Sequence, residues 1–190
     1  MSINLQKGQK IDLTKSNPTV SKYAVALGWD ENANVGSAFD LDVSAFILGA
    51  TGKMLSDKHF VFFNNLESPT QAVVHTGDNL TGAGSTNDKE TLFVDFSKID
   101  DTANEIVFVS TIYDAQARAQ NFGQVRNAFI RIYNPDTNEE FMKYDLGEDF
   151  SLETGVEFGR IYKNGTEWKF NAVGQGRSGG LEDYLKEFNV

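Results

Sequence analysis

The chain has 190 residues and carries 17 lysines and arginines against 27 aspartates and glutamates, a formal net charge of −10. The absence of cysteine excludes disulfides, thiol catalysis, iron–sulfur clusters and thiolate zinc, and two histidines are too few for a multi-histidine zinc site or to favour a Ser-His-Asp triad. The negative charge argues against nucleic acid as a partner, because that affinity comes from Lys and Arg side chains that displace counterions.

The predicted elements are mostly short strands rich in Val, Ile, Phe and Tyr, several with alternating apolar and polar residues. In chain order they are Lys22–Trp29, Phe39–Leu48, His59–Asn65, Thr91–Phe96, Glu105–Tyr113, Arg126–Asn134, Glu140–Leu146, Gly155–Lys163 and Thr166–Val173. The few helical signals are a turn at Asp100–Asn104, one or two turns at Asp114–Phe122, and a terminal helix at Leu181–Phe188.

Turn residues separate these strands, as expected for hairpins. Asn134–Asn138 reads Asn-Pro-Asp-Thr-Asn, and Asn164-Gly165 is the strongest two-residue hairpin signal in the chain. Strands at this spacing, with no regular helices between them, predict an all-β fold, an antiparallel two-sheet β-sandwich. The length suits one domain, so we expect residues 1–190 to form a single unit.

The start of the chain lacks the apolar segment of a secretory signal. No run approaches the ~18 apolar residues that a membrane span needs. We therefore predict a cytoplasmic protein without direct membrane insertion.

Most of the negative charge lies in residues 30–101, which hold twelve acids and four lysines. Carboxylates crowded without basic partners repel one another, and a fold tolerates such a cluster where solvent or a cation neutralises it. Either a solvated acidic face or a cation site explains this distribution. Which carboxylates converge in space decides between them.

Asp40 and Asp42 are the first candidates for a cation site. In the predicted strand Phe39–Leu48 the apolar residues at odd positions face the core, so both aspartates project from the other face. Their Cα atoms would lie ~6.6 Å apart, and a hard divalent cation would offset the repulsion between the carboxylates. The alternative is an exposed strand face that carries two aspartates.

Residues 77–90 supply more oxygen ligands from a glycine-rich loop. Asp78, Asn79, Asp88 and Glu90 have side-chain oxygens, and glycines allow backbone carbonyls to turn inward. Calcium takes 6–8 oxygen ligands from such groups, whereas magnesium keeps more water. The spacing of an EF-hand is missing. An acidic surface hairpin is the alternative for this loop.

Asp30 and Asp57 lie at the ends of predicted strands and would join these ligands if their loops share one end of the sandwich. An ordinary turn aspartate is the alternative for each.

Three other motifs are weaker. Asp40-Leu-Asp imitates a phosphotransferase motif that requires a parallel α/β sheet, and Gly174–Gly179 imitates a dinucleotide loop but lacks the βαβ unit, so we expect it to turn the chain into the terminal helix. His75 lies beside the acidic loop without an evident nucleophile, which does not support a role as general base.

Motifs along the whole chain resemble the tellurium-resistance TerD family. They are Leu27–Asp30, Phe39–Leu48, Gly52-Lys53, Asp57, Phe60–Asn65, His75–Asn79, Gln120–Val125, Asn127–Phe129 and Ala172–Leu181. The resemblance implies a single calcium-binding β-sandwich similar to C2 domains, acting in bacterial tellurite and stress resistance without established enzymatic activity.

The resemblance also implies a ligand set for Ca²⁺, with more than one ion bound. These metal residues are Asp30, Asp40, Asp42, Asp57, Asp78, Asn79, Asp88 and Glu90. Ser85-Thr86-Asn87 departs from the family, which often has a more acidic run there. The implied partners are calcium ions and other tellurium-resistance proteins, including a membrane component.

Calcium binding is therefore the leading hypothesis for function. A metal-dependent hydrolase or phosphotransferase would use the same acids but needs an open coordination position and a general base. A third hypothesis is a protein-docking scaffold with incidental metal binding. Gln120–Val125 would then be a candidate contact, although a buried Phe122 that anchors the loop is the alternative.

Overall fold

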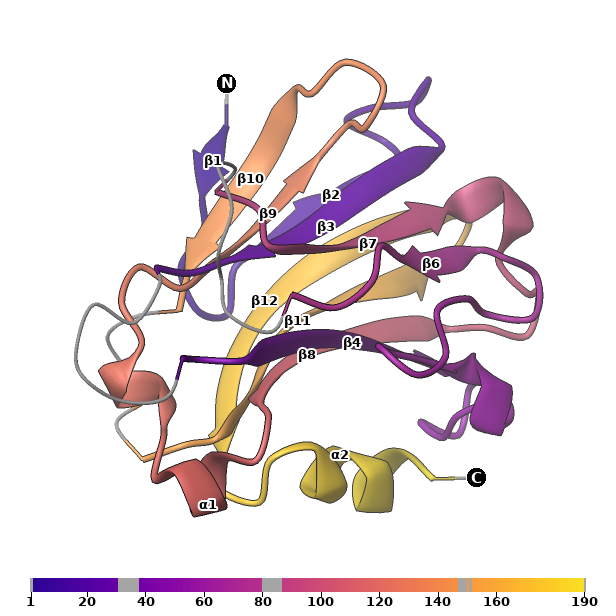
Figure 1. Ribbon diagram of the computed structural model, residues 1–190. Helices are drawn as coiled ribbons and strands as arrows, with labels where there is room; N and C mark the ends of the chain where they lie inside the picture. Colours follow the sequence, from indigo (N-terminus) through magenta and orange to yellow (C-terminus); the bar gives the residue numbers. More distant parts are fainter. Residues whose placement is uncertain (1, 31–37, 80–86, 147–149, 151, 190) are drawn as a thin grey trace.

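The computed structural model describes residues 2–30, 38–79, 87–146, 150 and 152–189. Within these ranges the strands form two six-stranded sheets that pack face to face (Figure 1). No helix in the described part of the chain is long and apolar enough to cross a membrane. The predicted two-sheet β-sandwich is confirmed.

Almost all neighbouring strands run antiparallel; β1 is the exception and pairs parallel with β10. The first sheet contains, in spatial order, β1 (Ile3–Asn4), β10 (Glu140–Asp145), β9 (Phe129–Tyr133), β3 (Lys22–Gly28), β7 (Glu90–Asp95) and β6 (Val73–His75). The second contains β2 (Lys10–Asp12), β12 (Glu167–Arg177), β11 (Gly155–Asn164), β8 (Glu105–Ile112), β4 (Leu41–Leu48) and β5 (Phe60–Val61).

The described helices are short and lie outside the two sheets. They are the 3-10 helices η1 (Asp57–His59), η2 (Phe96–Lys98) and η3 (Phe122–Gln124), and the α-helices α1 (Ala115–Arg118) and α2 (Leu181–Phe188). The terminal helix α2 has the predicted bounds. The one or two helical turns predicted at Asp114–Phe122 are α1 and the start of η3.

Two predicted segments differ from the structure. The strand predicted at 59–65 is reduced to β5, because Phe62 and Asn65 close a tight turn through two backbone hydrogen bonds of 3.0 and 2.9 Å. The glycine-rich segment predicted to be a turn after residue 173 instead continues β12 to Arg177, where it still pairs with β11. The chain bends at residues 178–180, where Gly180 has a φ of 61°.

The hairpin predicted at Asn164-Gly165 joins β11 and β12, but its turn is shifted by one residue. Asn164 and Glu167 pair across the two strands, so Gly165 and Thr166 form the turn. Gly165 has a φ of 66°, a conformation that a residue without a Cβ adopts without strain.

The alternation along β4 has a consequence for the site. Val43, Ala45 and Ile47 contribute to the core between the sheets, as predicted. The opposite face of β4 is also buried, because Phe46 and Leu48 pack with Tyr184 and Phe188 of α2 and its surroundings in a second apolar cluster, and Figure 1 shows α2 beneath this sheet. Asp40 and Asp42 do not lie on an exposed strand face either, because both side chains are buried.

Candidate metal centre

Three carboxylates converge at the start of β4. Asp40, Asp42 and Asp78 each offer one oxygen, and these oxygens all lie within 4.8 Å of one another. Asp40 is 3% and Asp42 5% exposed, whereas Asp78, which follows β6, is exposed. The structure thus brings together residues that are 38 positions apart in the sequence.

An unusual junction between the sheets holds these segments in place. The second half of β4 pairs with β5 along one edge. Along the same edge in the first half of β4, side chains from the opposite sheet take the place of a neighbouring strand. The Val43 amide donates to Glu90 Oε2 at 2.8 Å, and the Val43 carbonyl oxygen lies 3.1 Å from His75 Nε2. Glu90 and His75 therefore satisfy both backbone groups of Val43, as a neighbouring strand would.

Glu90 also anchors the segment that carries Asp78. Its Oε1 accepts a hydrogen bond of 3.0 Å from the Asn79 amide, and its side chain is fully buried. His75 Nδ1 accepts from the Gly77 amide at 2.9 Å, so Nε2 carries the proton and donates to Val43. Both imidazole nitrogens of His75 are thereby occupied.

The electrostatics of the cluster disfavour three free negative charges. Burial raises the pKa of Asp42 from 3.8 to about 8, and the negative charges of Glu90, Asp40 and Asp78 add to this effect. Burial also raises the pKa of Asp40, and Arg118 opposes that rise. The metal-free cluster therefore retains a proton near neutral pH.

Asp40 is only partly neutralised by the protein. Its Oδ2 lies 3.4 Å from Arg118 Nη1 of α1, a long contact for a charge-assisted hydrogen bond. Its Oδ1 is buried without a hydrogen-bond partner. An unpartnered carboxylate oxygen beside two further carboxylates is a position that a cation would fill.

The three acids open into a pocket of about 670 Å³. Tyr113, half exposed, forms part of the wall, and its ring lies 5.3 Å from the Arg118 guanidinium carbon. Phe63 and Asn64 contribute the remaining side. Arg118 and Tyr113 are site residues that the sequence did not reveal, because neither motif nor spacing relates them to Asp40.

The other predicted ligands are placed differently. Asp88 forms a bidentate pair with Arg131 at 2.7 and 2.6 Å, and Asp30 Oδ2 accepts from the side-chain Nδ2 of Asn127 at 2.6 Å in a separate pocket. Asp57 is exposed in η1, just before β5, which pairs with Ala45 and Phe46 of β4. The structure therefore does not bring these three acids to the cluster.

Residues 80–86, the centre of the predicted glycine-rich loop, lie outside the described residues. Of the remaining loop ligands, Asn79 contributes its backbone to Glu90, and Glu90 organises the site from within the protein. Among the described residues, one group of three or more acids could hold a metal ion. Its oxygens are hard donors, which suit calcium or magnesium and not the softer transition metals.

The whole chain is similar to proteins of stress and tellurium resistance. It matches the TerD domain over residues 1–188. It is 54% identical over 191 residues to general stress protein 16U of Bacillus subtilis (strain 168), and the alignment covers 100% of this chain and 98% of the relative. It is 46% identical over 190 residues to tellurium resistance protein TerD of Serratia marcescens, with 100% and 98% covered.

A solved structure agrees in fold. The homologue of telluride resistance protein (TerD) SCO6318 from Streptomyces coelicolor A3(2) superposes with a TM-score of 0.72 over 90% of this chain and 99% of that chain, at 15% identity. The match over nearly all residues, together with the relatives' identity, establishes that the chain belongs to the TerD family of tellurium-resistance and stress-response proteins.

Proposed function

We propose that this TerD-family protein is a non-enzymatic calcium-binding protein of bacterial stress and tellurite resistance. The observation that carries the proposal is the convergence of Asp40, Asp42 and Asp78, with carboxylate oxygens within 4.8 Å of one another. Two of these acids are buried, and Asp40 Oδ1 has no hydrogen-bond partner. Such an arrangement is unfavourable without a cation and favourable with one.

Calcium fits this donor set better than magnesium does. The site combines two buried aspartates with an exposed one, and calcium accepts irregular sets of 6–8 oxygens, completing them with water and backbone carbonyls. Magnesium demands near-ideal octahedral geometry and gives up its water reluctantly. A bound divalent cation would favour ionisation of Asp42 and offset the repulsion that raises its pKa.

The alternative of a metal-dependent hydrolase lacks support at the same site. The histidine beside the acids, His75, is buried, and both of its ring nitrogens are occupied by Gly77 and Val43. It therefore has no nitrogen free to activate a water molecule. Phe122 of the segment considered as a docking contact is buried, as expected for an anchored loop.

Thermal unfolding with and without calcium tests the proposal. At a calcium concentration of 100 times the dissociation constant, binding to the folded form adds about 2.7 kcal/mol, which shifts the melting temperature of a chain this long by roughly 5–10 °C. We expect a smaller shift with magnesium. The absence of a shift with calcium would overturn the proposal.

Two variants locate the effect. The double variant Asp40→Asn/Asp42→Asn should lose most of the calcium shift, because it removes two anionic ligands while preserving side-chain size. Asp57→Asn is the matched control, since Asp57 is exposed and remote from the cluster. A full calcium response in the double variant would place the site elsewhere.

A further inference from the structure

Arg118 is a cation that the protein itself places beside the proposed calcium ligands. Its Nη1 lies 3.4 Å from Asp40 Oδ2. Among the described residues that line the carboxylate pocket, Arg118 is the one lysine or arginine. Its charge opposes the binding of a metal ion, because it neutralises part of the negative charge that attracts the ion.

The backbone on both sides of Arg118 is tied to the segment that carries Asp40. The Tyr113 amide donates to the Asp40 carbonyl oxygen at 2.8 Å, and Gln120 Nε2 donates to the Ala38 carbonyl oxygen at 3.2 Å. Between these two anchors, the Tyr113 ring lies 5.3 Å from the guanidinium carbon, a distance at which an aromatic face attracts a cation. The guanidinium is therefore held beside Asp40 by its surroundings.

The short helix α1 that ends with Arg118 lies between two residues in the left-handed backbone conformation. Asp114, at the N-cap, has a φ of 50°, and Ala119, at the C-cap, has a φ of 51°. Alanine avoids this conformation, because its Cβ comes too close to the following carbonyl oxygen. Strain of this kind persists where the surrounding contacts enforce it, and it clusters at functional sites. Here it lies on the residue that follows Arg118.

The charges of the carboxylate site balance when one divalent ion is added. The three ionised aspartates, Asp40, Asp42 and Asp78, contribute −3, and Arg118 contributes +1, which leaves −2. One calcium ion would bring this sum to zero. Both carboxylate oxygens of the neighbouring Glu90 are engaged by backbone amides, so Glu90 is not counted as a ligand. Without Arg118 the three aspartates would instead match a trivalent ion.

We propose that Arg118 sets the affinity and the charge selectivity of the calcium site. This inference rests on the proposed function, because it assigns Arg118 a role toward the same ion. The guanidinium repels an ion that shares Asp40 with it, and this repulsion grows with the charge of the ion. Only 27% of the Arg118 side chain is exposed, so water screens the repulsion in part. The wild type therefore binds calcium more weakly than the three aspartates alone would, and trivalent ions are disfavoured further.

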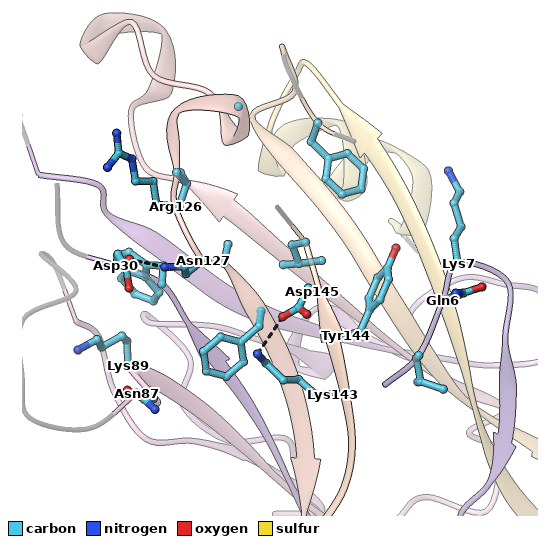
Figure 2. A pocket seen from close by; sticks show the side chains of 18 residues that line it. Gln6, Lys7, Asp30, Asn87, Lys89, Arg126, Asn127, Lys143, Tyr144 and Asp145 are labelled. Carbon is cyan, nitrogen blue, oxygen red and sulfur yellow. Dashed lines mark hydrogen bonds and ion pairs between the residues drawn. The ribbon is translucent and has the colours of Figure 1, made fainter. Parts of the chain in front are cut away.

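Calorimetric titration of Arg118→Gln with calcium tests the affinity. Glutamine keeps a polar side chain that can donate to Asp40, but it carries no charge. We expect the variant to bind calcium about tenfold more tightly than the wild type. Arg126→Gln is the control for the change in net charge, because Arg126 is exposed and lines a separate pocket that shares no residue with the carboxylate site (Figure 2). Its calcium affinity should equal that of the wild type.

The outcomes separate this inference from the proposed function. If neither the wild type nor Arg118→Gln takes up calcium, the calcium site itself is refuted. If both bind calcium and Arg118→Gln binds it equally well or more weakly, only the role of Arg118 is refuted. An equal gain in Arg126→Gln would also refute it, because the effect would then belong to the net charge of the protein.

Terbium tests the charge selectivity, because it is trivalent and close to calcium in size. Coulomb energy is proportional to the charge of the ion, so a tenfold gain for calcium corresponds to about thirtyfold for terbium. Tyr113 lines the pocket, so terbium luminescence excited through tyrosine reports binding there. The ratio of terbium affinity to calcium affinity should rise about threefold in Arg118→Gln. An unchanged ratio would contradict the proposed selectivity.

Urea unfolding distinguishes this role from a merely structural one. In EDTA, Arg118→Gln should be less stable than the wild type, because buried Asp40 loses its ion-pair partner. At the same high calcium concentration this difference should narrow, because the variant gains more from binding. Arg177 has a similarly exposed side chain and pairs with Glu187, so Arg177→Gln should lose equal stability in both conditions. An equal loss in both conditions for Arg118→Gln would overturn the proposal.

Discussion

Replacing Asp42 by asparagine should stabilise the calcium-free protein and remove most of the stabilisation by calcium. The unfolded aspartate ionises with a pKa near 3.8, whereas burial and three nearby carboxylates raise the folded value to about 8. Because the folded state holds the proton more tightly, this group lowers stability progressively as the pH rises between those two values.

The size of the effect follows from linkage. One unit of pKa corresponds to about 1.4 kcal/mol, so at pH 7 the wild type loses about 4 kcal/mol relative to a side chain that does not ionise. At pH 5 the same loss is only about 1–2 kcal/mol. Asparagine preserves the shape and removes the ionisation, and the gain in the variant should therefore be larger at pH 7 than at pH 5.

Urea unfolding followed by tryptophan fluorescence measures both the gain in stability without calcium and the lost stabilisation by calcium, since both tryptophans are buried. With EDTA the variant should be more stable than the wild type at pH 7. With saturating calcium this difference in stability should become smaller or change sign. A variant that is less stable than the wild type in EDTA at pH 7, or that responds equally to calcium, would refute the reasoning.

Three further substitutions probe the scaffold, each by urea unfolding. Glu90→Gln should lower the stability of the calcium-loaded protein by about 1–3 kcal/mol, because the single side-chain oxygen of glutamine cannot accept both backbone hydrogen bonds that the two carboxylate oxygens accept. An unchanged stability would show that Glu90 does not anchor these segments. Gly28→Ala should cost about 1–3 kcal/mol, since a Cβ there would lie 2.4 Å from both the Asn87 carbonyl oxygen and the Phe129 ring, and a neutral result would show that both neighbours can move aside. Arg160→Met leaves the fully buried Glu157 without its ion-pair partner and should cost about 3–5 kcal/mol; Glu157→Gln added to it should restore part of that loss, and no restoration would exclude the unpaired charge as the cause.

The sequence predicted the sheets well where strands are long and apolar. β3, β4, β8 and β11 lie within a few residues of their predicted bounds, because their periodicity and flanking turns are strong. The strands β1, β2 and β6 were missed. Each has only two or three residues, too few for alternation to be visible, and their pairing depends on contacts distant in the sequence.

The candidate site was predicted in part. Alternation placed Asp40 and Asp42 on the same side of the chain at the start of β4, but it could not show that both are buried, in a pocket that Phe63, Tyr113 and Arg118 also line. Asp57 was a candidate ligand only if its loop shared their end of the sandwich; it lies in η1, just before β5, and is not part of the cluster. For Asp88, the pairing with Arg131 depends on a strand 43 residues away, which no local pattern reveals.

Calorimetric titration of the metal-free protein with calcium tests the central claim most directly, because it reports affinity and stoichiometry together. The wild type should give a saturable isotherm, and the heat of that binding event should be absent in Asp40→Asn/Asp42→Asn. A wild type that takes up no calcium, or a double variant whose isotherm matches it, would contradict a cation centre at the start of β4.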